Sequence, residues 1–176
     1  MTQNDSPAPE FSYEIDIDDV GRAGKKFQLS ANETERAKIA KRLKTPSVEK
    51  LEGEMRVTAS KTGVRITGDI AANLTRECVA SLEHMPETIA ESFEIDFTRI
   101  PPENDDVEEE DLDAPEFLEG ETLDLGELLV QQLSLSMEPF PRKEGAKSLA
   151  EAYAPKENAS PFAGLKQALG KSDDNQ

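Results

Sequence analysis

The chain has 176 residues and a formal net charge of −17 at pH 7, and only 36% of its residues are hydrophobic and 5% aromatic. This length allows one domain with tails, and the low apolar content predicts that a sizeable share of the chain stays solvated. The charge disfavours nonspecific wrapping of nucleic acid, the single Cys excludes an internal disulfide, and no apolar run is long enough for a transmembrane helix.

The N-terminal part predicts two strands joined by a turn. Residues 1–10 are polar and contain Pro, which predicts a disordered leader. Apolar residues occupy every second position of Phe11–Ile17, as in a half-buried strand. Residues 18–26 contain two Gly and turn the chain, and residues 27–29 indicate a short second strand. We expect a single α+β domain over residues 11–141.

A basic helix is predicted next. Ser30 or Asn32 can cap its N-terminus, and the helix should run from Glu33 to Leu43 and end before Pro46. Its apolar stripe is narrow, and its remaining surface is basic. This pattern fits either a solvated helix face or a face that contacts a polyanion. The candidate RNA-contacting residues of this helix and of the preceding turn and strand are Arg22, Lys25, Lys26, Arg36, Lys38, Lys41 and Arg42.

A meander of antiparallel strands follows the helix. Met55–Ala59 and Val64–Ile70 alternate in polarity and are joined by a turn at Lys61–Gly63. Ile89–Phe97 gives the clearest period of two in the chain. Together with Phe11–Ile17, these strands predict a curled, barrel-like antiparallel sheet with the helix over one end.

The sequence then predicts an acidic loop and a second helix. Residues 101–122 are dense in Asp and Glu, which fits a solvated spacer or a docking arm for a basic partner. In Leu123–Met137 the Leu residues recur at helical spacing, with Asp124 as the N-cap and Pro139 after the end. We interpret this apolar stripe as part of the core.

The C-terminal part predicts one more short helix. Residues 142–159 form a linker, residues 160–170 a short C-terminal helix with Pro at its first position, and residues 171–176 a disordered tail. Such a helix is too short to be stable alone. It can dock on the body or stay free as a partner-binding peptide.

Three segments together resemble a known family. They are the turn Cys78-Val79-Ala80-Ser81-Leu82-Glu83, the helix from Leu123 to Leu133, and the segment from Ser160 to Lys166. Their order and spacing are similar to the YceD family, also called the large ribosomal RNA subunit accumulation proteins. The positions that match the family pattern are Cys78, Leu82, Glu83, Asp124, Leu125, Gly126, Glu127, Leu128, Pro161, Phe162 and Leu165.

The resemblance implies a small bacterial, non-enzymatic factor that supports synthesis, processing or accumulation of large-subunit (23S) ribosomal RNA. Many relatives carry a second Cys in the turn and a further pair after the long helix, which suggests zinc. This chain has Ser81 at the second position and no Cys in Met137–Arg142, so four zinc ligands are not available. We therefore expect neither a metal nor another cofactor.

Catalysis is not expected from the residues themselves. Cys78 and His84 are close in sequence, but no pattern supplies an oxyanion hole, an orienting third group or a Gly-rich phosphate loop. The ordinary interpretation is a packed Cys and a His in a turn.

Charge is strongly polarised along the chain. Arg22 to Lys50 contains nine Lys or Arg and three Glu, whereas Glu83 to Glu138 contains nineteen Asp or Glu and one Arg. The first hypothesis is therefore a cytoplasmic ribosome-assembly factor whose basic residues contact ribosomal RNA or a pre-ribosomal particle. The alternative is a protein-only adaptor that binds a basic partner, such as a ribosomal protein, through its acidic loop or C-terminal helix. Neither hypothesis involves a membrane.

Overall fold

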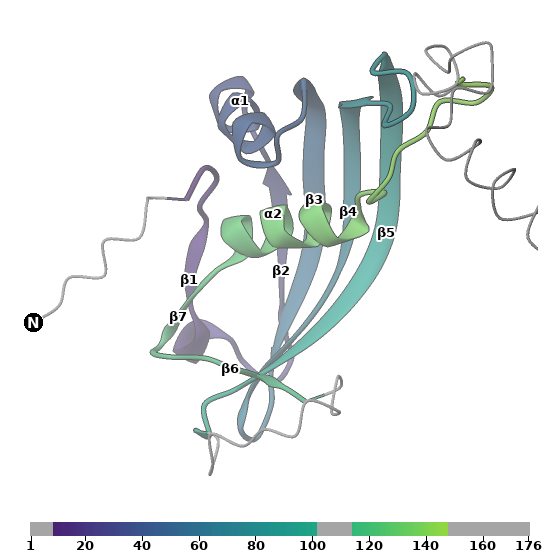
Figure 1. Cartoon of the computed structure of the whole chain (residues 1–176). Helices are drawn as coiled ribbons and strands as arrows, with labels where there is room; N and C mark the ends of the chain where they lie inside the picture. Colours follow the sequence, from purple (N-terminus) through teal and green to yellow (C-terminus); the bar gives the residue numbers. More distant parts are fainter. Residues whose placement is uncertain (1–8, 102–113, 148–176) are drawn as a thin grey trace, which may run out of the picture.

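The computed structural model describes residues 9–101 and 114–147 of the chain (Figure 1). Strands dominate this part, and two α-helices accompany them. In chain order the elements are β1 (Glu14–Asp16), the 3-10 helix η1 (Ile17–Asp19), β2 (Lys25–Ser30), α1 (Glu33–Arg42), β3 (Ser47–Ala59), β4 (Gly63–Glu77), β5 (His84–Thr98), β6 (Glu116–Phe117), β7 (Thr122–Asp124) and α2 (Leu125–Ser136).

The main sheet has five strands in the order β2-β3-β4-β5-β6. The first four are antiparallel neighbours, and β6 pairs in parallel with the end of β5. β3, β4 and β5 have 13, 15 and 15 residues. β4 and β5 extend beyond the predicted strands at both ends, and β3 extends beyond its prediction at the N-terminal end. The loop between β4 and β5 is accordingly limited to residues 78–83.

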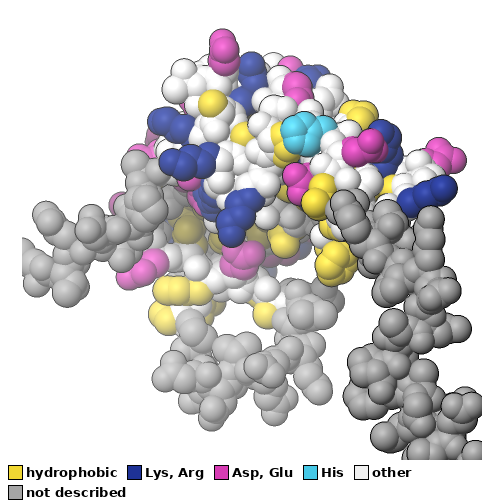
Figure 2. Space-filling model, turned by 45° about the horizontal axis from the view of Figure 1, so that its top comes forward, with side chains coloured by type: hydrophobic (Ala, Val, Ile, Leu, Met, Phe, Trp, Pro, Cys, Tyr) yellow, Lys and Arg dark blue, Asp and Glu magenta, His cyan; other side chains and the backbone are white. Residues whose placement is uncertain are grey.

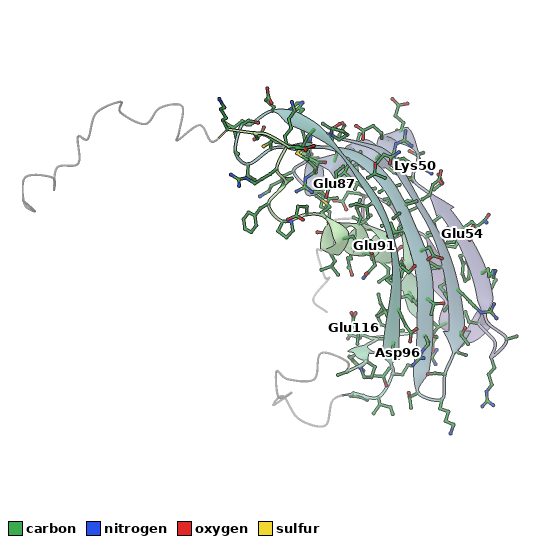
Figure 3. The ribbon with its side chains drawn as sticks, turned by 90° about the vertical axis from the view of Figure 1, so that its right-hand side faces the viewer. Lys50, Glu54, Glu87, Glu91, Asp96 and Glu116 are labelled. Atoms are coloured by element: carbon green, nitrogen blue, oxygen red, sulfur yellow. The ribbon has the colours of Figure 1, made fainter. Side chains whose placement is uncertain are left out.

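The prediction of an α+β fold is confirmed, and the sheet is curved as expected (Figure 3). It does not close into a barrel within the described residues, because β2 and β6 end the strand order without pairing with each other. The physical reason is that α2 fills the concave side of the sheet. A closed barrel of so few strands would leave no space for a helix there.

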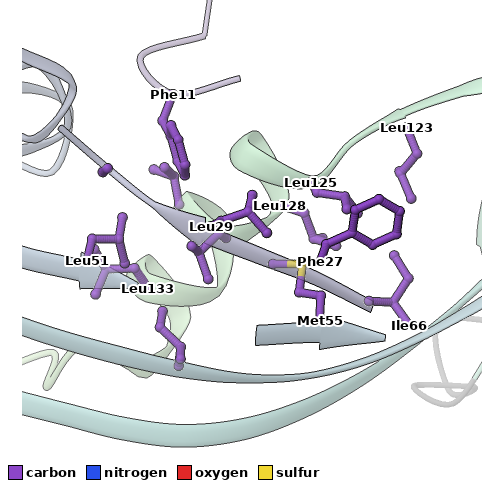
Figure 4. Packing of buried hydrophobic residues seen from close by; sticks show 14 of the residues in the cluster. Phe11, Phe27, Leu29, Leu51, Met55, Ile66, Leu123, Leu125, Leu128 and Leu133 are labelled. Carbon is purple, nitrogen blue, oxygen red and sulfur yellow. The ribbon is translucent and has the colours of Figure 1, made fainter. Parts of the chain in front are cut away.

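α2 supplies much of the core that covers the concave face of the sheet (Figures 1 and 4). Leu125, Leu129 and Leu133 have no exposed surface. Leu129 lies directly over Gly53 of β3, where a Cβ atom would come within 2.7 Å of the Leu129 side chain. The predicted assignment of the α2 stripe to the core is correct, and glycine lets the helix approach the sheet closely.

The predicted first strand does not join the main sheet. Only Glu14–Asp16 of Phe11–Ile17 is a strand, and it pairs with β7 in a separate two-stranded sheet. Phe11 instead packs in the core, and Ile17 begins η1, where the Asp16 carboxylate accepts a hydrogen bond from the Asp18 N–H at 2.8 Å. The alternating pattern was therefore correct about the burial of Phe11, Ile15 and Ile17, but Tyr13 is 46% exposed. The pattern was also wrong about the sheet to which the strand belongs.

The basic helix forms as predicted, with a capping box. The Asn32 side chain accepts a hydrogen bond from the Glu35 N–H at 3.0 Å, and the Glu35 carboxylate accepts one from the Asn32 N–H at 2.7 Å. Ile39 and Ala40 are buried, and the helix ends at Leu43, where the following Lys44 adopts a φ of 54°. α1 thus lies against the N-terminal end of β3 and leaves its basic face outside.

Several predicted segments lie outside the described residues. They include most of the leader at 1–10, most of the acidic loop at 101–122, much of the linker at 142–159, the short helix at 160–170 and the tail at 171–176. In the two ranges that the structure describes, neither helix has the length and apolarity to cross a membrane.

Candidate functional site

The structure separates the seven predicted RNA-contacting residues into two groups. Arg22, Lys25 and Lys26 lie before or at the start of β2, and the other four lie on α1, which follows its end. β2 has six residues, so it places the two groups about 20 Å apart along its axis. A segment that is continuous in the sequence therefore becomes two separate cationic surfaces.

Two of the four arginines and lysines on α1 are engaged within the protein. The Arg42 guanidinium makes a bidentate contact with Glu127 of α2, with both distances 2.7 Å, and a third contact with Glu10 at 2.9 Å. Hydrogen bonds from these two carboxylates raise the pKa of Arg42 above its ordinary value. Arg36 donates to the Ala31 carbonyl at 2.6 Å. Both residues thus help to hold α1 in place.

Three exposed lysines lie on α1 and directly after its end. Lys38 and Lys41 are on the helix, and Lys44, which is not among the candidates predicted from the sequence, follows the C-cap Leu43. None of the three makes an ion pair with another described residue. We name Lys38, Lys41 and Lys44 the α1 lysine face. Figure 2 shows Lys and Arg side chains gathered over the end of the molecule that carries α1.

The second group is smaller and less uniform. The Lys25 ammonium lies 5.5 Å from the centre of the Phe27 ring, and Arg22 and Lys26 are exposed. Lys26 is paired in register with Arg56 of β3, whose guanidinium donates to the Ala23 carbonyl. This end of β2 is cationic, but its side chains point in different directions from the edge of the sheet.

The residues of the Asp124–Leu128 motif have structural roles. The Asp124 carboxylate caps α2 by accepting from the N–H groups of Gly126 and Glu127 at 2.9 and 3.0 Å, and it also accepts from the Tyr13 N–H at 2.8 Å. Gly126 is required because a Cβ atom there would lie 2.8 Å from the Phe11 carbonyl oxygen. Leu125 and Leu128 are buried. The motif therefore fixes the N-terminal segment to the start of α2.

The turn after β4 forms a second structured place around the only cysteine. Cys78 is completely buried, and its sulfur accepts a hydrogen bond from the Lys143 N–H at 3.3 Å. The Val79 N–H donates to the Pro141 carbonyl at 2.9 Å. The turn and the segment after α2, which are about 60 residues apart in sequence, thus lie against each other.

A Lys–Glu pair and a strained residue complete this turn. The Lys143 ammonium lies 3.0 Å from the Glu83 carboxylate, and this hydrogen bond lowers the pKa of Glu83. Leu82 has a φ of 59°, which a residue with a side chain rarely adopts, and 56% of its surface is exposed. Of the three family positions in the turn, Cys78 is therefore buried, Glu83 paired and Leu82 exposed. Pro161, Phe162 and Leu165 lie outside the described residues.

The pKa of Cys78 is lowered to about 6. The Ser81 hydroxyl is the main cause, and the N–H of Lys143 is the next. Ser81 Oγ is buried and has no hydrogen-bond partner of ordinary geometry among the described residues, so it acts on the sulfur as a nearby dipole. The turn therefore favours the thiolate form of Cys78, although the sulfur is not exposed to a reactant.

Replacement of Ser81 with Ala is expected to raise the pKa of Cys78 from about 6 towards that of a free thiol, because the strongest stabilising dipole is lost. The measurement is the ultraviolet absorbance of the thiolate across pH, with Cys78→Ala as the blank. The folded pKa lies below the unfolded one. The thiolate therefore stabilises the fold above the unfolded pKa, and this stabilisation is lost as the pH falls through about 6. An unchanged midpoint in Ser81→Ala would contradict this assignment.

The donor set around Cys78 does not fit the zinc site that the resemblance suggested. A structural zinc site needs four ligands, most often thiolates or imidazoles. Here the turn offers one thiol and the Ser81 hydroxyl, and the adjoining segment from Pro139 to Gly145 contains neither Cys nor His. Among the residues that the structure describes, no group of three potential ligands is close enough to hold a metal ion.

Comparison with known proteins identifies one family. A family model described as "Large ribosomal RNA subunit accumulation protein YceD" matches residues 66–168, more than half of the chain. The match includes most of β4, β5, the Cys78 turn, the Asp124–Leu128 motif and α2, and it leaves out α1 and β3. No curated protein and no solved structure matches the chain.

Proposed function

The chain belongs to the YceD family of large ribosomal RNA subunit accumulation proteins, and from this premise we propose that it is a non-catalytic factor in the biogenesis of the large ribosomal subunit. In this role it supports the synthesis, processing or accumulation of 23S ribosomal RNA. The geometry at Cys78 supports a non-catalytic role, because its sulfur is buried while His84 is exposed at the start of β5.

The observation that carries an RNA contact is the α1 lysine face. Lys38 and Lys41 lie on the capped helix α1 and Lys44 lies just after its end. All three are exposed and have no carboxylate partners among the described residues. Ammonium groups in this arrangement bind phosphates without reading bases, which suits a folded RNA. Arg36 and Arg42 belong to the original seven candidates, but their internal contacts favour a structural role.

The predicted test is RNA binding as a function of salt. The triple variant Lys38→Gln, Lys41→Gln, Lys44→Gln is expected to bind a 23S RNA fragment more weakly than the wild type does. The plot of log K against log salt has a negative slope, and its steepness should decrease by about 2 to 3. The reason is that fewer counterions are released on binding when phosphate contacts are lost. Filter binding or fluorescence anisotropy at several salt concentrations gives both quantities.

A matched control removes the same charge elsewhere. Lys61, Arg142 and Lys147 are exposed and lie away from α1 in the sequence. Replacing all three with Gln removes three positive charges, so this variant has the same net charge as the α1 triple variant. If the two triple variants lost affinity equally, only the overall charge would matter and the α1 lysine face would be refuted as a contact surface. Levels of 23S RNA in cells that carry each variant then test the biological role.

A further inference from the structure

One long edge of the main sheet has no strand partner. β5 pairs with β4 along all of its 15 residues, but on its other side β6 pairs only with Phe97 and Thr98. Residues 84–96 therefore have no strand beside them in the described part of the chain. An exposed sheet edge of this length is unusual, since proteins normally shorten or cover such edges.

The hydrogen bonds at the end of β5 show which backbone groups face outward. The Arg99 N–H donates to the Thr62 carbonyl at 2.8 Å, towards the β4 side, whereas the Thr98 carbonyl accepts from the Leu118 N–H at 2.9 Å on the β6 side. Along an antiparallel strand these directions alternate. The even-numbered residues of β5 therefore direct their N–H and C=O groups away from the sheet.

Pro86 agrees with this assignment. It is an even-numbered residue of β5, and Pro, which has no N–H, is found in sheets where the missing donor would face solvent. Beyond Pro86, each even-numbered residue supplies an outward N–H group. The residues that supply them before the pairing with β6 are Thr88, Ala90, Ser92, Glu94 and Asp96.

The side chains along this edge carry one sign of charge. β5 contains Glu87, Glu91, Glu94 and Asp96 and no Lys or Arg, and Figure 3 shows three of these carboxylates spaced along the strand. Arg76 of β4 neutralises Glu87. Arg65 of β4 pairs with both Glu94 and Asp96, so these three residues together keep one negative charge. Glu91 is exposed and makes no ion pair with another described residue. The edge is therefore acidic.

We propose that the edge of β5 from Thr88 to Asp96 is a docking site for an extended, Lys- and Arg-rich segment of a partner protein, which adds to the sheet as a further strand. Backbone hydrogen bonds to the even-numbered residues provide the affinity, and the carboxylates select for basic side chains. The nine residues span about 30 Å, so a peptide of about seven to nine residues fills the edge.

Charge favours a basic partner segment over two other possible occupants of the β5 edge. A second copy of the chain would place carboxylates opposite carboxylates and would bring together two molecules of charge −17. The chain's own residues before β6 are likewise acidic in sequence. The free edge of β2 provides an internal comparison, because it begins with Lys25 and Lys26 and should repel a basic peptide.

The experiment uses the full chain and a nine-residue peptide of alternating Lys and Val. Amide hydrogen exchange by NMR is expected to show new protection at Thr88, Ala90, Ser92 and Glu94. The odd-numbered amides of β5 already form hydrogen bonds with β4, so their protection should not increase. The protection of the β2 amides should not change either. A peptide N-methylated at alternate residues has the same charge but cannot complete the ladder, and it is expected to bind at least tenfold more weakly.

Two protein variants test the backbone and the charge separately. Ala90→Pro removes an outward N–H that β4 does not use, and it should weaken peptide binding at least tenfold, whereas Ala90→Val should bind as the wild type does. Glu91→Lys should weaken binding several-fold in low salt, while the same reversal at the exposed Glu14 of β1 should not. Glu91→Lys keeps the test valid if Ala90→Pro fails to fold.

Several results would overturn the proposal. These are equal binding of the N-methylated peptide, equal binding of both folded variants, or new protection on β2 instead of β5. Protection at Thr88 to Glu94 without peptide would show that the chain itself, or a second copy in a dimer, already fills the edge. Because this experiment contains no RNA, its failure leaves the α1 lysine face untouched, and failure of that surface leaves the β5 edge untouched.

Discussion

Replacement of Leu129 with Ala is expected to destabilise the protein by about 3 kcal/mol, measured as the free energy of unfolding in urea. Leu129 has no exposed surface and lies at the centre of the contact between α2 and the sheet, directly above Gly53. Its removal leaves a cavity that the long strands cannot close, because their hydrogen bonds to each other hold them in place.

The control is Leu135→Ala on the same helix. Leu135 is 77% exposed, so the same change in side chain should alter the free energy of unfolding by less than about 0.5 kcal/mol. A loss of similar size at both positions would show that helix propensity, not packing on the sheet, determines the effect.

A second change can test the contact itself. Gly53→Ala alone should destabilise the protein, because the new Cβ atom would lie 2.7 Å from Leu129. In the Leu129→Ala background that carbon partly fills the cavity instead. The double variant is therefore expected to be more stable than the sum of the two single effects predicts. If the effects of the two substitutions on the free energy of unfolding were strictly additive, a direct contact between Gly53 and Leu129 would be contradicted.

Replacement of Arg76 with Met is expected to destabilise the protein by about 2 to 3 kcal/mol. Arg76 and Glu87 form an ion pair of 2.7 Å across β4 and β5, and their side chains are only 13% and 14% exposed. The ion pair also fixes the backbone of Glu138, two residues after the end of α2. The Glu138 N–H donates to Glu87 at 2.9 Å, and Arg76 donates to the Glu138 carbonyl at 3.0 Å. The variant leaves a largely buried carboxylate without its cation.

Arg65→Met is the matched control for this prediction. Arg65 lies on the same strand and makes a bidentate contact with Asp96, but 54% of its side chain is exposed. Solvent screens such a pair, so its loss should destabilise the protein much less than the loss of Arg76 does. In addition, the double variant Arg76→Met, Glu87→Leu should recover part of the stability, because it leaves no unpaired charge. Equal losses at Arg76 and Arg65 would show that burial does not strengthen the first pair.

The candidate site could be predicted only in part. Local sequence identified the basic residues of α1, since charge and helical spacing are visible in the chain. It did not identify the engagement of Arg42, because the partner Glu127 is 85 residues away on α2. Lys44 was not among the candidates, although it stands in the same basic stretch of sequence as Lys38 and Lys41. The edge of β5 had no local signal at all.

By itself the sequence determined the elements whose cause is local: the strand alternation in β3, β4 and β5, the capping box of α1 and the Asp124 cap of α2. These depend on hydrogen bonds and burial patterns within a few residues. Only the tertiary structure decided that β1 leaves the main sheet for β7, that α2 fills the concave face in place of a barrel, and that β5 keeps an open edge. Each of these depends on which distant segments pack together, and alternation records only which face of a strand is buried.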